Sequence, residues 1–318
     1  MAENRRAAVV GAGTMGHGIA QVFAQAGHAV CLVDSRPEAL TEASKRIREN
    51  LALLLDQGII SPEKADTTLR LIRPVNSLQE CVKNAEFITE CVTEDLDLKR
   101  QIFEQLDCFA PSDAIIASNT SSLSLADISQ KVKHKSRLII THYFNPPHVI
   151  PTVEVAVCEF TAPSTAARTC ETLREIGKQP ILLKKSLPGF LVNRVQAAIV
   201  RELLYLLEEG VATVEQIDNA IKGTIGLRLA VMGPFKVMDL GGLDVWTNVA
   251  RNLFPHLDNS KGVPSALAEK YAAGHWGFKS GRGFYDGIFP ERASAGPSEI
   301  YKRDRSLIRL LKLLGTEG

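Results

Sequence analysis

The chain has 318 residues, of which 45% are hydrophobic and 23% are charged, as expected for a globular protein with two domains of ordinary size. Its 37 basic and 36 acidic residues almost cancel, which argues against a nucleic acid or a membrane surface as a partner. Six scattered cysteines without a C-x-x-C pair argue against a disulfide framework and a metal site, and the chain carries neither a signal-peptide pattern nor a bilayer-long apolar run, so we expect a cytoplasmic protein.

Strand and helix signals alternate over the first half of the chain. A first strand at 7–10 leads into a glycine-rich turn and a helix that ends near Gly27, and a second strand follows at 29–33. A long helix is expected at 38–57. The later signals predict strands at 87–92, 114–117, 138–141, 153–155 and 181–183, with helices at 96–109, 123–128 and 163–176. This β-α-β-α order predicts an α/β fold with a doubly wound (Rossmann-type) parallel sheet.

The pattern changes at Pro188-Gly189, after which the periodicity is helical. We therefore expect two domains, a dinucleotide-binding domain at 1–187 and an all-helical domain at 188–318. An amphipathic helix at 298–314, after a Pro/Gly/Ser-containing stretch at 287–298, is predicted as an appendage. The breaks between helices of the second domain are expected at Gly210, Gly233-Pro234 and Gly241-Gly242.

A glycine-rich sequence follows the first strand and opens the first helix. It fits G-x-G-x-x-G, in which the first glycine permits a tight turn and the second lets the backbone approach a pyrophosphate that the helix N-terminus attracts. Asp34 ends the second strand, where an acid can bind the ribose 2′-OH and repel a 2′-phosphate; this favours NAD over NADP, although Arg36 could soften the preference. The plainer alternative is a helix N-terminus whose glycines serve packing only. The expected cofactor contacts are Gly11, Gly13, Thr14, Met15, Gly16 and Asp34.

Among seven histidines, His142 is the candidate general base, because it ends the apolar strand at 138–141, at the sheet edge where doubly wound folds bind their ligands. Oxidation of a secondary alcohol needs a base for the hydroxyl proton as the hydride leaves carbon. Glu154 lies between two valines, and a buried carboxylate is costly unless it is paired, so His142 is its expected partner. The alternatives are a core histidine bonded to the backbone and an edge-strand glutamate.

Further motifs follow in order along residues 6–287. Besides the glycine-rich turn and Asp34, they are ECVTEDLDLK (90–99), SNTSSL (118–123), HYFNPP (142–147), VEV (153–155), PGFLVNR (188–194), GPF (233–235) and GFYD (283–286). Together they resemble the L-3-hydroxyacyl-CoA dehydrogenase family, including its lambda-crystallin/L-gulonate dehydrogenase branch. The resemblance implies NAD as the cofactor, a helical C-terminal domain through which the chain forms a homodimer, and an active site between the two domains.

The resemblance also implies roles for single residues. It makes His142 the base and Glu154 the group that orients it. Ser121 and Asn193 would hydrogen-bond the substrate's 3-oxygen, where negative charge gathers as in an oxyanion hole. The plainer alternatives are a helix N-cap for Ser121 and a helix N-terminal group for Asn193. The remaining implied positions are Asn145, which would support the loop after His142, and Glu94, Lys99 and Asn119, which would border the nicotinamide ribose.

Two departures from the family bear on the substrate. Members that act on coenzyme A thioesters often carry lysines at the end of the helix after the ribose-binding acid, where they meet the nucleotide phosphates. Here Leu51–Gln57 holds no lysine but an acid, although Lys45, Arg46 and Arg48 lie earlier on the same helix. The stretch before Gly233-Pro234 is longer than in those enzymes and holds Arg228, which could grip a free carboxylate or form a surface ion pair.

Three functions are therefore weighed. The leading prediction is NAD-dependent oxidation of a short L-3-hydroxyacyl-CoA, such as 3-hydroxybutyryl-CoA, to the 3-oxo compound, as in fatty acid metabolism. A close second is oxidation of a small free hydroxy acid, of the gulonate or carnitine kind, with Arg228 on the carboxylate. A non-catalytic NAD-binding structural protein is the third, and against it stands the set Ser121, His142, Glu154 and Asn193, which a structural role does not need.

Overall fold

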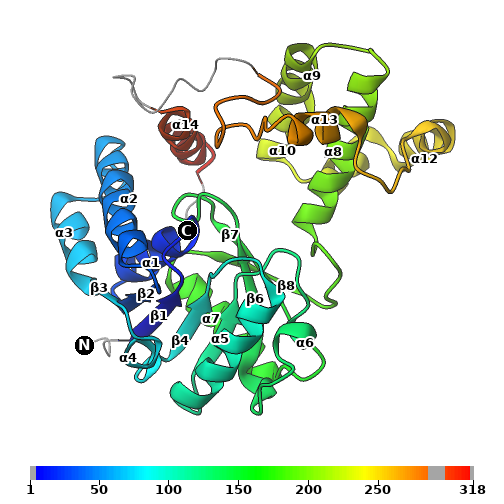
Figure 1. Ribbon diagram of the computed structural model, residues 1–318. Coiled ribbons are helices and arrows are strands. Elements are labelled where there is room, and N and C mark those ends of the chain that lie inside the picture. The colour runs from blue at the N-terminus through cyan, green and yellow to red at the C-terminus, as the bar shows by residue number, and fades with distance from the viewer. Residues whose placement is uncertain (1–4, 286–297, 316–318) are drawn as a thin grey trace. The chain divides into compact units, whose positions relative to one another are not determined.

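The computed structural model describes residues 5–285 and 298–315, and these form two compact units (Figure 1). The first, here called the sheet unit, holds the described chain up to Asn193 together with Arg303–Leu310. The second, the helical unit, holds the described residues within Arg194–Lys302 and Leu311–Gly315. None of the described helices has both the length and the apolar character needed to cross a bilayer.

Eight strands of the sheet unit form one sheet in the order β3-β2-β1-β4-β5-β6-β7-β8. All neighbouring pairs are parallel except β6 and β7, which are antiparallel. The predicted doubly wound α/β fold is confirmed, but the sheet is mostly rather than wholly parallel. The strands are β1 (Arg6–Val10), β2 (Ala29–Val33), β3 (Ile72–Val75), β4 (Phe87–Glu90), β5 (Ile115–Ser118), β6 (Leu138–Tyr143), β7 (Thr152–Ala156) and β8 (Gln179–Leu183).

Helices cover both faces of this sheet. Phe23 of α1 and Leu173 of α7 are completely buried on one face, and Phe103 and Leu106 of α5 are completely buried on the other. Burial on both faces explains why the inner strands are continuous apolar runs in the sequence. The helices are α1 (Gly16–Gln25), α2 (Pro37–Asp56), α3 (Pro62–Leu71), α4 (Leu78–Val82), α5 (Leu96–Phe109), α6 (Leu125–Ile128) and α7 (Pro163–Glu175).

The reversed strand pair follows from the length of its connection. Only residues 144–151 join β6 to β7, whereas a parallel crossover needs a dozen residues or more. The chain therefore turns straight back, and the antiparallel register sets His142 directly opposite Glu154. The prediction of a parallel sheet missed this reversal, which brings two strand residues face to face.

Residues 62–82 form α3, β3 and α4, which the sequence pattern did not predict. The strand β3 has the polar and proline-containing sequence IRPV, so it lacks the apolar run that marked the other strands. It lies at the edge of the sheet, paired only with β2, and a proline is tolerated there because no second neighbour needs its N–H. The sheet therefore extends one strand beyond what hydrophobicity indicated.

The helical unit consists of helices and their connections, as predicted. Its breaks fall at the expected glycines: α8 ends before Gly210, and α11 begins at Pro234 and ends at Gly241. None of the residues in α9 to α13 is buried. The helices are α8 (Val192–Glu208), α9 (Val214–Ile221), α10 (Leu227–Val231), α11 (Pro234–Gly241), α12 (Leu243–Leu253) and α13 (Ser265–Ala272).

The predicted C-terminal helix is α14 (Glu299–Leu313), and its middle part belongs to the sheet unit. Ile308 is buried there, and Arg309 Nε donates to Oε1 of Gln57 at 3.2 Å, beside the end of α2. The helix is therefore more than an appendage. The stretch predicted at 287–298 lies, apart from Ser298, outside the described residues.

Candidate active site

The glycine-rich turn joins β1 to α1 with little room for side chains. Gly11 has a φ of +99°, and a Cβ there would lie 2.7 Å from the carbonyl oxygen of Cys91. A Cβ at Gly16 would lie 1.8 Å from the carbonyl oxygen of Gly11, so helix and turn pack backbone to backbone. A Cβ at Gly13 would meet nothing within 4 Å. The two outer glycines therefore serve packing, and Gly13 alone faces open space, as a site for a pyrophosphate requires.

Asp34 lies beside this turn, immediately after β2. Its Oδ2 accepts the N–H of Ala12 at 2.9 Å, and its Oδ1 accepts the N–H of Arg36 at 3.0 Å. The carboxylate is thus fixed against the glycine-rich turn, and each oxygen keeps a further lone pair for a hydroxyl donor. Open space at Gly13, the first turn of α1 and this carboxylate fit a dinucleotide whose ribose carries a free 2′-OH.

The end of β4 holds a buried ion pair. Asp95 caps α5 by accepting the N–H of Leu98 at 2.8 Å, which puts Lys99 in the first turn of that helix. Lys99 Nζ then lies 2.6 Å from Glu90 Oε1, and the lysine side chain is only 1% exposed. Burial raises the pKa of Glu90, and the charge of Lys99 opposes that rise. Lys99, an expected neighbour of the nicotinamide ribose, therefore lies inside the protein and in contact with Glu90.

Glu94 accepts hydrogen bonds from residues 120–122 of the SNTSS motif, just after β5. Its Oε1 accepts the hydroxyl of Thr120 at 2.6 Å and the N–H groups of Ser121 and Ser122, both at 3.1 Å. Burial would raise the pKa of Glu94, but the hydrogen bond from Thr120, the charge of Lys99 and the bonds from the serines together lower it. Ser121 is exposed and does not cap a helix, because α6 begins at Leu125. The alternative of an N-cap role for Ser121 is therefore wrong.

His142 and Glu154 form the central pair of the site. The two residues are opposite each other in β6 and β7, and His142 Nδ1 lies 2.8 Å from Glu154 Oε2. Both side chains are buried, at 7% and 1% exposure. With the carboxylate accepting from Nδ1, the ring's Nε2 carries the free lone pair. The rings of Phe144 and Phe190 pack on the imidazole, with centroids 4.7 Å and 5.4 Å away.

The second oxygen of Glu154 is also bound. Its Oε1 accepts the N–H groups of Leu191 and Val192, each at 2.9 Å, where α8 begins. Phe190, just before them, has a φ of +52°, a left-handed conformation that is uncommon for a bulky residue. The carboxylate that binds His142 therefore also accepts backbone N–H groups at the start of α8.

Four other predicted site residues lie at four different places. Asn119 Oδ1 accepts the N–H of Tyr143 at 2.9 Å, which ties the end of β5 to the residue after His142. Asn145 is exposed in the loop after β6, and Asn193 is half-buried in the first turn of α8. Arg228 is exposed in α10 of the helical unit.

Two residues at the site were missed by the sequence reasoning. Glu90 lies inside the apolar run predicted at 87–92, the same signal that singled out Glu154, so it could have been found. Lys178 had no such signal. It is buried, and its Nζ donates to the carbonyl oxygens of Pro147 at 2.7 Å and Ile150 at 2.8 Å, which fastens the loop after β6. Burial lowers the pKa of Lys178 to about 8.

Comparison with known proteins gives the same family over both parts of the chain. Residues 6–186 match the 3-hydroxyacyl-CoA dehydrogenase NAD binding domain, and residues 189–287 match the C-terminal domain of 3-hydroxyacyl-CoA dehydrogenase. The solved structure of 5-formyl-3-hydroxy-2-methylpyridine 4-carboxylic acid 5-dehydrogenase, an NAD⁺-dependent dismutase, is similar with a TM-score of 0.88 and 31% identity, and the match covers 99% of this chain and 100% of that one.

Three curated relatives that carry different protein names are similar to this chain. The 5-formyl-3-hydroxy-2-methylpyridine 4-carboxylate 5-dehydrogenase of Mesorhizobium japonicum is 33% identical over 98% of both chains. The probable 3-hydroxybutyryl-CoA dehydrogenase of Bacillus subtilis is 35% identical over 89% of this chain and 98% of its own. The lambda-crystallin homolog of Bos taurus is 36% identical over 73% of each chain.

Proposed function

Because the chain belongs to the 3-hydroxyacyl-CoA dehydrogenase family, whose members are NAD-dependent oxidoreductases acting on CH–OH groups, we propose that it oxidises the secondary hydroxyl of a small free hydroxy acid. The hydrogen bond between His142 and Glu154 carries this proposal. It leaves the Nε2 lone pair of His142 to accept the hydroxyl proton, and the carboxylate then stabilises the charged ring. NAD, when bound, accepts the hydride. Phe144 and Phe190 pack on the ring and limit the access of water.

The end of α2 favours a free acid over a coenzyme A thioester. The last turn of that helix has no basic residue, and its Leu53 and Leu54 are buried. In the thioester enzymes that the chain resembles, lysines there meet the nucleotide phosphates. The chain is also similar to a pyridine carboxylate dehydrogenase over 98% of both chains.

The substrate class is tested by steady-state rates of NADH formation on 3-hydroxybutyryl-CoA and on free acids such as gulonate, carnitine and 3-hydroxybutyrate. We expect kcat/KM to be higher on at least one free acid than on the thioester. A higher value on 3-hydroxybutyryl-CoA would overturn the choice of substrate but would leave the dehydrogenase activity in place. Absence of NADH formation on every compound would instead support the structural-protein alternative.

Arg228 is the proposed partner of the substrate carboxylate. It is exposed on α10, and a guanidinium can bind a carboxylate through two parallel hydrogen bonds. We expect Arg228→Ala to raise KM for the accepted acid by roughly tenfold or more, as for the loss of a charged hydrogen bond. Arg251→Ala, which removes another exposed arginine of the helical unit, is the matched control. Equal KM values for the two variants would remove Arg228 from the site.

A short 3-hydroxyacyl-CoA is the second candidate, and one contact favours it. Arg309 of α14 lies beside Gln57. It therefore places a positive charge near the end of α2, where this chain lacks the lysines of the thioester enzymes. If the nucleotide phosphates bind there, Arg309→Ala raises KM for 3-hydroxybutyryl-CoA and leaves KM for free acids unchanged. An unchanged KM for the thioester would remove this support.

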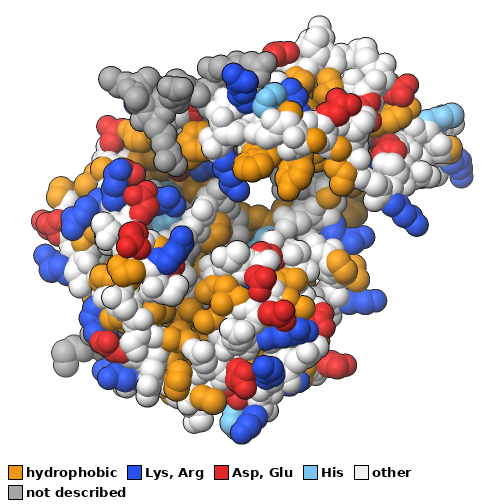
Figure 2. Space-filling view, in the orientation of Figure 1, with side chains coloured by type: hydrophobic (Ala, Val, Ile, Leu, Met, Phe, Trp, Pro, Cys, Tyr) orange, Lys and Arg blue, Asp and Glu red, His pale blue; other side chains and the backbone are white. Residues whose placement is uncertain are grey.

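We also propose that the protein forms a homodimer through the helical unit. Large apolar side chains are exposed on it, including Phe235 at 79% and Leu240 at 71%, and Figure 2 shows hydrophobic side chains on its surface. Contiguous apolar patches on a protein surface mark interaction surfaces. Sedimentation should give twice the mass of 34.7 kDa, and Leu240→Asp should shift it to a monomer, while Ile59→Asp, at an exposed apolar residue of the sheet unit, should not. A monomeric parent protein would contradict this proposal.

A further inference from the structure

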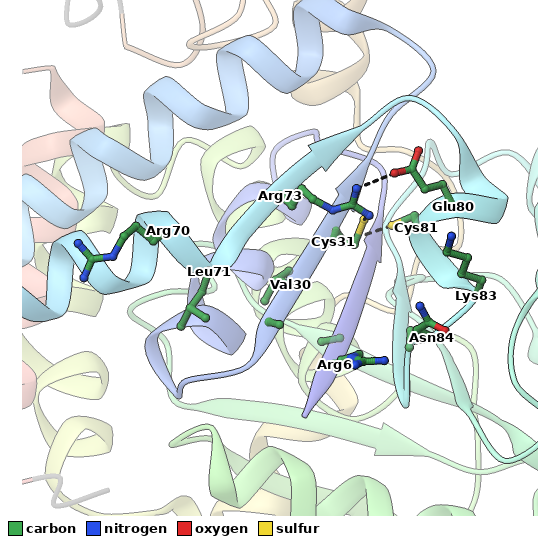
Figure 3. Close-up of a pocket in the computed structure, with 13 residues that line it drawn as sticks. Arg6, Val30, Cys31, Arg70, Leu71, Arg73, Glu80, Cys81, Lys83 and Asn84 are labelled. Atoms are coloured by element: carbon green, nitrogen blue, oxygen red, sulfur yellow. Dashed lines mark hydrogen bonds and ion pairs between the residues drawn. The ribbon is translucent and has the colours of Figure 1, made fainter. Parts of the chain in front are cut away.

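An open pocket lies on the sheet face that α4 only partly covers, away from the glycine-rich turn (Figure 3). It has a volume of about 330 Å³ and is lined by residues from β1, β2, β3, α3 and α4 and from the segment after α4. The short helix α4 has only five residues, so it leaves the first residues of these strands uncovered. None of the groups in this pocket takes part in the proposed dehydrogenation.

Two cysteines meet in the pocket. Cys31 in the middle of β2 is partly exposed, and Cys81 on α4 is buried beside it. The Cys81 Sγ donates to the carbonyl oxygen of Cys31 at 3.3 Å. The neighbouring Cys81 side chain, helped by the charge of Arg73, lowers the pKa of Cys31 against the effect of burial, while the Cys31 side chain and burial raise the pKa of Cys81. The pair is therefore asymmetric, with Cys31 as the readier thiolate.

Cationic side chains line the pocket, and one of them lies close to the Cys31 sulfur. Arg73 Nη2 lies 3.8 Å from Cys31 Sγ, and its Nη1 donates to Glu80 Oε1 at 2.6 Å in an exposed ion pair (Figure 3). Arg6 and Lys83 add positive charge to the lining, while Glu80 is the only acid among the lining residues and is already paired with Arg73. The pocket therefore attracts an anion to a cysteine prepared for nucleophilic attack.

We propose that this pocket is a thiol–disulfide exchange site for low-molecular-weight disulfides of anionic thiols, with Cys31 as the attacking group and Cys81 as the resolving group. The Cys31 thiolate attacks one sulfur of the ligand disulfide, a mixed disulfide forms, and the other half leaves as a thiolate. Cys81 then loses its proton to solvent and attacks Cys31 Sγ, which expels the second half as a thiolate. The protein is oxidised to a Cys31–Cys81 disulfide while the ligand is reduced to its free thiols.

Oxidised glutathione is the probe, applied to the full-length protein and followed by peptide mapping. The parent chain should lose the two thiol hydrogens at Cys31 and Cys81, while Cys81→Ser should accumulate a glutathione adduct on Cys31. The exposed Cys108 is an internal reference, and Cys31 should react about tenfold faster despite its lower exposure. Equal rates at the two positions would overturn the proposal.

The role of charge is tested with cystamine, a cationic disulfide of the same reactive type. Cys31 should prefer oxidised glutathione over cystamine, and Arg73→Gln should abolish that preference without changing the reaction of Cys108. If the parent chain shows no preference, or if Arg73→Gln leaves it intact, the anionic specificity is wrong. Because the readout is covalent labelling, it does not depend on the proposed dehydrogenase function.

Discussion

Two buried pairs at the same edge of the sheet look alike and differ in chemistry. Lys99 and Glu90 lie 2.6 Å apart at the end of β4, and His142 and Glu154 lie 2.8 Å apart near the end of β6. An ammonium group has donors only, so Lys99 cannot take a proton from a substrate. The imidazole bonded through Nδ1 keeps a free acceptor at Nε2. Short distance and burial therefore do not identify a general base; a remaining lone pair on a titratable ring does.

The largest expected effect is on the His142 side of this comparison. His142→Ala removes the proton acceptor, and turnover should fall by roughly 10²–10⁴-fold, the range for a lost general base. Calorimetric titration should give nearly the same Kd for NAD, because His142 contacts Glu154 and not the glycine-rich turn. A variant with parental turnover would remove the residue from the mechanism.

A substitution of Lys99 should change the free energy of unfolding. Lys99→Met leaves the buried Glu90 without its cation, and the loss should be about 3–5 kcal/mol in the free energy of unfolding, measured with urea. The loss should grow as the pH rises, because the raised pKa of Glu90 lets it protonate and avoid the charge at low pH. Lys45→Met, which breaks an exposed pair with Glu49, should cost less than about 1 kcal/mol. Similar losses in both variants would contradict the contrast.

Asp34 extends the comparison to a carboxylate that accepts two backbone N–H groups and has Arg36 Nε 3.7 Å away. Asp34→Ala removes the expected acceptor for the ribose 2′-OH and the charge that repels a 2′-phosphate. The ratio of kcat/KM for NAD to that for NADP should fall by roughly 10- to 100-fold, as for a charge-assisted hydrogen bond. A variant that still rejects NADP would show that another group sets the preference.

The smallest effect concerns Lys178, a cation held by carbonyl oxygens alone. Its pKa of about 8 lies below the ordinary 10.5, so above pH 8 the unfolded chain binds more protons and stability rises with pH. Between pH 7 and 9 the parent chain should therefore gain about 1 kcal/mol of unfolding free energy relative to Lys178→Met. A pH-independent difference in urea unfolding would contradict the lowered pKa.

Much of this site was predictable because it lies at the ends of apolar strands. Asp34 and His142 each close such a run, and Glu154 between two valines called for a buried partner. The reversal of β7 was not predictable from apolar runs, since buried parallel and antiparallel strands have the same pattern; the eight-residue connection at 144–151 was the available clue. Lys178 could not be found, because its role depends on two carbonyl oxygens about thirty residues earlier.

The shared use of Glu154 limits how this dyad can be transplanted. One oxygen accepts a hydrogen bond from the imidazole Nδ1 and so fixes the tautomer. The other accepts the backbone N–H groups of Leu191 and Val192. If only a histidine and a glutamate were grafted onto another sheet, the second carboxylate oxygen would be bound by water alone. The carboxylate would then be free to rotate and would no longer hold the imidazole in one orientation. The graft would therefore need the incoming helix as well, with a residue able to adopt the left-handed turn of Phe190.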